Sequence, residues 1–140
     1  MKSNKIIVVF IVIIITMFGG FYAYNHIQKV SLAKHYYDIG DYKKASDLKV
    51  GDISEKSVTL NIAKNWRSDL NNPEDLYITI MLMYDEIEAN KEKDIEYVDK
   101  LNTYYENIAD HFNISKNCLD DIGKMSPSDG TSTIKSLPTF

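Results

Sequence analysis

Hydrophobic and polar residues divide this chain into one continuous apolar segment and a longer stretch in which the two kinds alternate with a helical period. The segment Ile6–Ala23 contains no charged side chain and would be about 27 Å long as a helix, close to the hydrocarbon thickness of a bilayer. Lys2 and Lys5 precede it, and aromatic residues gather at its other end. The pattern therefore predicts one transmembrane helix within residues 1–25.

A cleaved secretory signal is the alternative interpretation of this segment. Cleavage after Ala23 or Gly20 would place Phe21 or Phe18 where the protease requires a small side chain, so we expect an uncleaved signal-anchor. The very short N-terminal tail favours a single-pass protein with its N-terminus in the cytoplasm and its C-terminal domain outside the cell membrane. Gly19 and Ala23 form a pair of small residues at helical spacing, which allows a homo-oligomer through this helix.

The rest of the chain reads as a helical extramembrane domain over residues 26–125, followed by a Ser- and Thr-rich tail, 126–140, that we expect to be disordered. No segment alternates with a period of two, so the fold class is all-α, a small antiparallel bundle with short loops. Glycine, proline and capping residues mark the predicted helices, which are Ile27–Ile39, Tyr42–Val50, Asp52–Leu70, Pro73–Ala89, Asp94–Phe112 and Ser115–Met125.

Periodicity also predicts which side chains form the core. The helix starting at Asp52, with Asp52 and Glu55 as its capping box, has one expected apolar face: Val58, Ile62, Ala63, Trp66 and Leu70. The helix Pro73–Ala89 is apolar nearly all round and is expected at the centre of the bundle, with Trp66 buried against it. Tyr97 and Tyr104 fall off the main apolar face of the next helix and suggest a second contact strip.

The first predicted hairpin resembles the front of a tetratricopeptide repeat over about 14 residues, Leu32–Ala45. The resemblance implies that the hairpin is structural and that its key packing and turn residues are Ala33, Tyr36, Gly40, Tyr42 and Ala45. The pattern departs from the family at Lys49, Asp52 and Ser57, and no second copy follows at the expected period. It therefore favours a repeat-like helix-turn-helix at the start of the domain, without predicting a solenoid.

Composition and charge narrow the functional classes. Asp69–His111 holds twelve acidic residues and three lysines, net −9, whereas Lys29–Arg67 holds eight basic and five acidic residues, net +3. The acidic part disfavours nucleic-acid binding. Cys118 is the single cysteine, and the three histidines are scattered, so the sequence predicts no disulfide, no metal site and no cofactor. No catalytic triad or phosphate-binding loop is spaced correctly, and we do not expect an enzyme.

Two functional classes fit these observations. The first is a membrane-anchored helical module that binds another protein or a membrane complex at the bacterial cell envelope; the use of Ile, Lys, Asn and Tyr is typical of an AT-rich bacterial genome. The alternative is a small immunity or inhibitor protein that neutralises a toxin or phage factor at the membrane. For either class, the partner-contact candidates are His35, Tyr37, Lys43, Lys44, Glu88, Glu92 and Glu96.

Overall fold

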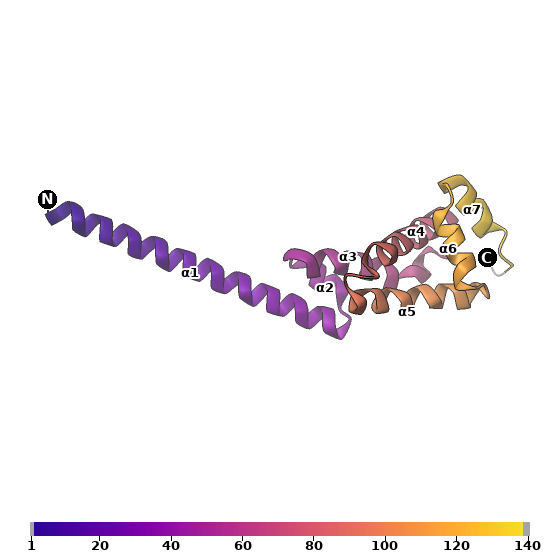
Figure 1. Ribbon diagram of the computed structural model, residues 1–140, viewed down its shortest axis with the longest axis horizontal. Coiled ribbons are helices and arrows are strands. Elements are labelled where there is room, and N and C mark those ends of the chain that lie inside the picture. The colour runs from indigo at the N-terminus through magenta and orange to yellow at the C-terminus, as the bar shows by residue number, and fades with distance from the viewer. Residues whose placement is uncertain (1, 139–140) are drawn as a thin grey trace. The chain divides into compact units, whose positions relative to one another are not determined.

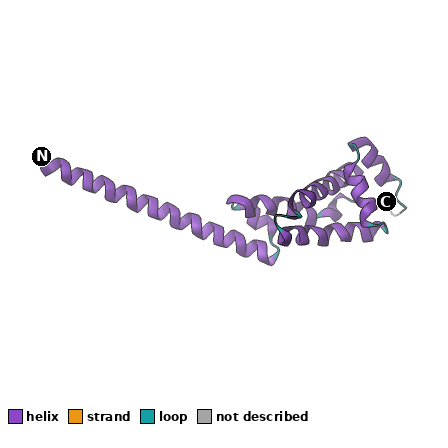
Figure 2. Cartoon of the chain, viewed as in Figure 1, coloured by secondary structure: helices purple, strands orange, loops and turns teal. Residues whose placement is uncertain are grey.

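The computed structural model describes residues 2–138, and every regular element in that range is helical (Figures 1 and 2). The prediction of an all-α fold is confirmed. The elements are α1 (Lys2–Ile39), α2 (Tyr42–Asp47), α3 (Gly51–Lys64), the 3-10 helix η1 (Trp66–Asp69), α4 (Pro73–Asn90), α5 (Ile95–Phe112), α6 (Lys116–Lys124) and α7 (Pro127–Lys135). The chain divides into two compact units, Met1–Glu55 and Lys56–Phe140.

α1 is one uninterrupted helix of 38 residues. The expected break between the apolar segment and a separate helix at Ile27 does not occur, because no glycine or proline separates Tyr24 from Ile39 and extending a helix is easier than nucleating a new one. The side chains of Ile6–Ala23 are all exposed. α1 is long and apolar enough to cross a membrane, as the sequence predicts.

A glycine turn ends α1 and leads into α2. Gly40 has φ 83°, and the N–H of Asp41 donates to the Tyr36 carbonyl at 2.9 Å, which is the hydrogen bond of a Schellman cap. α2 ends at Asp47 rather than Val50, and a turn with Lys49 in the left-handed region leads into α3, whose first residue, Gly51, is also left-handed.

α3 presents a different face to the interior from the one that periodicity predicts. It begins at Gly51, one residue before the expected cap Asp52, and it ends at Lys64, after which η1 continues the chain. The buried positions include Ser54, Ser57, Leu60 and Ala63, whereas Val58 and Ile62 are exposed. The predicted face is therefore wrong at Val58 and Ile62. Two serines look polar in sequence, but the Ser54 hydroxyl is satisfied by the Ala45 carbonyl at 2.7 Å and by the Val50 N–H at 2.9 Å.

Polar side chains cap the helix starts of the second unit, close to the residues where the sequence predicts those helices to begin. Asn72, Asp94 and Ser115 each accept a backbone N–H hydrogen bond of 3.1 Å at the start of α4, α5 and α6. Asn113 ends α5 in a left-handed conformation with φ 53°. Short polar side chains thus decide where these helices start and stop.

α4 is the central element of the second unit, as its nearly continuous apolar sequence predicts, and it packs against η1, α5, α6 and α7. Trp66 is 1% exposed, so its predicted burial is confirmed. The Trp66 ring meets the His111 ring edge-on at 5.4 Å between centroids. The aliphatic core of this unit consists of Leu60, Leu76, Ile80, Met83, Leu101, Ile108, Leu119, Ile122 and Ile134.

Residues 127–135 form helix α7, so the prediction of a disordered tail over 126–140 is wrong for this part; residues 139–140 lie outside the described range. Ser126 caps the helix by accepting from the Asp129 N–H at 3.3 Å, and Pro127 occupies its first position. Ile134 is fully buried. One buried isoleucine and a good cap therefore dock a segment whose composition otherwise resembles a linker.

Candidate functional site

The hairpin of α1 and α2 places small and aromatic side chains where the two helices pack. Ala33 and Ala45 are inaccessible, and Tyr42 is buried. The Tyr42 ring meets the Tyr37 ring edge-on at 6.0 Å, while Tyr36 is half-buried. Most of the residues that the repeat resemblance marks as structural thus lie in the interior of the hairpin.

The contact candidates of the first unit are not all exposed. His35, Lys43 and Lys44 are on the surface, but Tyr37 is only 5% exposed, so the expectation that it is available to a partner is wrong. Tyr37 lies one helical turn after Ala33, so both side chains are on the inward face of α1. The 14-residue motif did not show whether Tyr36 or Tyr37 would be the more buried of the two tyrosines.

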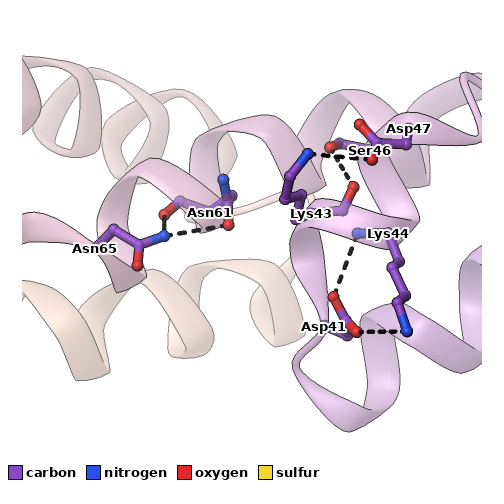
Figure 3. A network of polar contacts seen from close by, with 7 residues as sticks. All are labelled: Asp41, Lys43, Lys44, Ser46, Asp47, Asn61 and Asn65. Atoms are coloured by element: carbon purple, nitrogen blue, oxygen red, sulfur yellow. Dashed lines mark hydrogen bonds and ion pairs between the residues drawn. The ribbon is translucent and has the colours of Figure 1, made fainter.

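The two lysines of α2 pair with carboxylates close by in the sequence (Figure 3). Lys43 lies 3.3 Å from Asp47, and Lys44 lies 3.7 Å from Asp41. Exposed pairs of this kind contribute little to stability, on the order of 0–1 kcal/mol. These lysines can therefore exchange their carboxylates for those of a partner at small cost.

In the second unit, Glu88, Glu92 and Glu96 are exposed, as expected of contact candidates. Lys91 lies 2.8 Å from Glu88; this hydrogen bond lowers the pKa of the Glu88 carboxyl and raises the pKa of Lys91. Tyr97 is fully buried, so it cannot contribute to the second contact strip that its helical position suggested. Its hydroxyl donates to the Glu86 carboxylate at 2.8 Å.

A groove that the sequence did not reveal lies between the end of α3 and α4, and two isoleucines stand among its otherwise polar lining residues. We call it the α3–α4 groove; its volume is about 340 Å³, and its lining consists of Asn61, Ile62, Asn65, Ser68, Asp69, Asp75, Ile78 and Thr79. Ile62 is 37% and Ile78 is 52% exposed, so two isoleucine side chains meet solvent on the lining of one groove. Val58 extends the apolar surface by one turn of α3. The sequence did contain a signal for this groove. α4 is apolar nearly all round, and the neighbouring helices do not cover all of its apolar side chains.

Polar contacts hold the walls of this groove and the core behind it. Thr79 donates its hydroxyl to Asp69 at 2.7 Å, which fixes one wall of the groove. Deeper in the unit, Tyr105 donates to Asp120 at 2.8 Å. Burial of the phenol, followed by this hydrogen bond, raises the pKa of Tyr105 far above its usual value. Tyr105 therefore does not titrate near neutral pH and acts as a structural contact.

Within residues 2–138, no cluster of three or more His, Cys, Asp or Glu side chains could hold a metal ion. Cys118 is half-buried on α6. No protein-family model, curated protein sequence or solved structure matches the chain. The case for a function therefore depends on the chemistry of the chain's own surfaces.

Proposed function

We propose that this protein is a membrane-anchored helical interaction module that binds another protein at the bacterial cell envelope. The observation that carries the proposal is the exposed pair Ile62 and Ile78 on either side of the α3–α4 groove. Apolar side chains that converge on a concave surface are typical of binding sites, because a partner removes them from water.

The anchor in this proposal is the apolar part of α1. Its side chains over Ile6–Ala23 are exposed on all sides of the helix, and lipid is the environment that would accommodate them. Lys2 and Lys5, which precede the apolar residues, support an orientation with the N-terminus in the cytoplasm and the helical domain outside.

The groove also indicates the chemistry of the partner. Asp69 and Asp75 line it beside Ile62 and Ile78, and the surrounding segment Asp69–His111 has a net charge of −9. A complementary partner would present an aliphatic or aromatic side chain flanked by lysine or arginine. A basic amphipathic segment of another envelope protein fits this description.

Site-directed photocrosslinking in the native cell tests the proposal. A photoreactive residue in place of Ile78 should give a discrete crosslinked complex, and Ile62→Lys should abolish it because the new charge enters the groove. Asp121, an exposed position on α6 away from the contact candidates, is the control position and should give no such complex. Equal crosslinking from positions 78 and 121, no crosslink, or a crosslink to a second copy alone would overturn the proposal.

The hairpin supplies a second test of the same function. We propose that its tetratricopeptide-like packing orients His35, Lys43 and Lys44 toward the partner. Replacing both lysines by glutamate should leave the helical content unchanged, because their ion pairs lie at the surface. It should weaken the crosslinked complex formed from position 78. Unchanged complex formation would remove the hairpin from the proposed contact region.

The exposed acidic residues Glu88, Glu92 and Glu96 favour a second candidate, an immunity or inhibitor protein for a cationic toxin or phage factor. Such a protein would protect cells that express it. Replacing the three glutamates by glutamine should then abolish protection, whereas Ile78→Lys should not. A toxin gene beside this one would favour this candidate over the envelope module.

A further inference from the structure

A second groove lies in the first unit, where α1 runs past the turn between α2 and α3. Its volume is about 660 Å³, larger than that of the α3–α4 groove. One wall is formed by the segment of α1 that follows the apolar residues, and the other by Leu48, Lys49, Val50 and Gly51. Residues on both walls belong to the same compact unit.

The length of the apolar segment determines where this groove lies relative to the bilayer. The headgroup layer is about 5–7 Å thick on each side of the hydrocarbon, which corresponds to roughly four or five helical residues. If Ala23 ends the hydrocarbon-spanning part, Asn25 to Lys29 lie among the lipid headgroups. Tyr22 and Tyr24 are then at the interface, where tyrosine is enriched.

The charge of the lining suits an anion. Lys29, Lys49 and His26 line the groove, together with the side-chain amides of Asn25 and Gln28, and none of its lining residues is acidic. Among the residues described, neither Lys29 nor Lys49 has a carboxylate at ion-pair distance, unlike Lys43 and Lys44. Two unpaired ammonium groups and two amides are donors that match the oxygens of a phosphate group.

Lys49 reaches the groove from a backbone conformation that lysine rarely adopts, with φ 51°. Glycine or asparagine would fit this position with less strain. Lys49→Asn therefore removes the charge without adding backbone strain, because asparagine fits this conformation at least as well as lysine does.

From these observations we infer that the groove between α1 and the α2–α3 turn binds the phosphate group of an anionic membrane lipid. The inference rests on the proposed placement of α1 in a membrane and is independent of the α3–α4 groove. The first unit would then hold the segment of α1 that follows the apolar residues at the bilayer surface, because anionic lipids attract nearby lysines.

Native mass spectrometry of the full chain in detergent, titrated with phosphatidylglycerol or phosphatidylcholine, tests the inference. The parent should bind phosphatidylglycerol at least tenfold more tightly than phosphatidylcholine. The double variant Lys29→Gln, Lys49→Asn should bind phosphatidylglycerol about 30-fold more weakly than the parent. The control, Lys43→Gln with Lys44→Gln, removes the same charge outside the groove and should bind as the parent does.

Three results would overturn the inference: equal binding of the two lipids, unchanged binding in the groove variant, or displacement of the lipid by an equimolar amount of inorganic phosphate, which would make the site one for free phosphate. The proposed function is measured separately, by carbonate extraction of membranes and by crosslinking from position 78. A groove variant that keeps the crosslink but loses the lipid supports the inference. A parent that carbonate releases from the membrane overturns both proposals.

Discussion

Gly130→Val tests how α7 is held on the second unit. A Cβ atom at Gly130 would overlap the ring of Tyr77, and that ring cannot simply move aside. Tyr77 is almost completely buried, and its hydroxyl donates to the Met125 carbonyl at 2.5 Å. Either the ring shifts and this hydrogen bond is lost, or α7 lifts and uncovers Ile134.

The magnitude follows from the cheaper of these two responses. Leaving the buried hydroxyl or carbonyl unpaired costs about 1–3 kcal/mol, and exposing one isoleucine costs about 1.5–3 kcal/mol. Valine is a better helix former than glycine by about 0.4 kcal/mol, which offsets a small part. We expect α7 to lose about 1–2.5 kcal/mol of local stability, so that its amides exchange roughly 5- to 70-fold faster.

Hydrogen–deuterium exchange of the full chain in phosphatidylcholine nanodiscs measures this effect helix by helix. The matched control is Ser132→Val, a substitution at an exposed position of the same helix, for which exchange should change less than about threefold. Amides of α5 should be unaffected in both variants. Parent-like exchange of α7 in Gly130→Val, or equal acceleration in α5, would refute the reasoning.

Three further predictions concern the core, the hairpin turn and a buried phenol. Trp66→Ala should destabilise the second unit by ~3–5 kcal/mol in thermal melts followed by circular dichroism, whereas Val58→Ala should cost less than about 1 kcal/mol; equal melting temperatures would contradict the burial of Trp66. Gly40→Val should destabilise the hairpin more than Gly40→Asn in the same exchange experiment. Gly40 has φ 83° and a Cβ added there would meet no atom within 4 Å, so the cost of valine is conformational rather than steric contact with neighbours. The reverse order of the two variants would refute this reasoning. The raised pKa of Tyr105 keeps it protonated in the folded state, so its contribution is complete below about pH 10 and stability should fall as pH rises above that value, with a shallower fall in Tyr105→Phe; identical slopes would show that Tyr105 is not the cause.

Local chemistry determined much of the secondary structure directly from the sequence. A side chain that accepts from backbone N–H groups stabilises a helix start, so the sequence predicted helices that begin close to Asn72, Asp94 and Ser115. Gly40 ends α1 because a left-handed residue is needed there. The apolar segment of α1 and the apolar sequence of α4 predicted a membrane-length helix and a central helix, because burial and lipid exposure both depend on composition.

Tertiary packing decided which face of a helix is buried where the periodicity of the sequence allowed more than one. On α3, the face containing Ser57 and the face containing Val58 have similar spacing, and the inward one is set by which neighbours satisfy serine hydroxyls and accept small side chains. The same holds for Tyr37 of α1, which is buried because α2 packs against that side of α1 and brings Tyr42 onto its ring. α7 is stabilised by the burial of Ile134 in the core. This contribution to the free energy of folding exists only when the other helices are in place. The α3–α4 groove is a consequence of this packing. Ile62 and Ile78 are exposed because other side chains of α3 and α4 fill the interior.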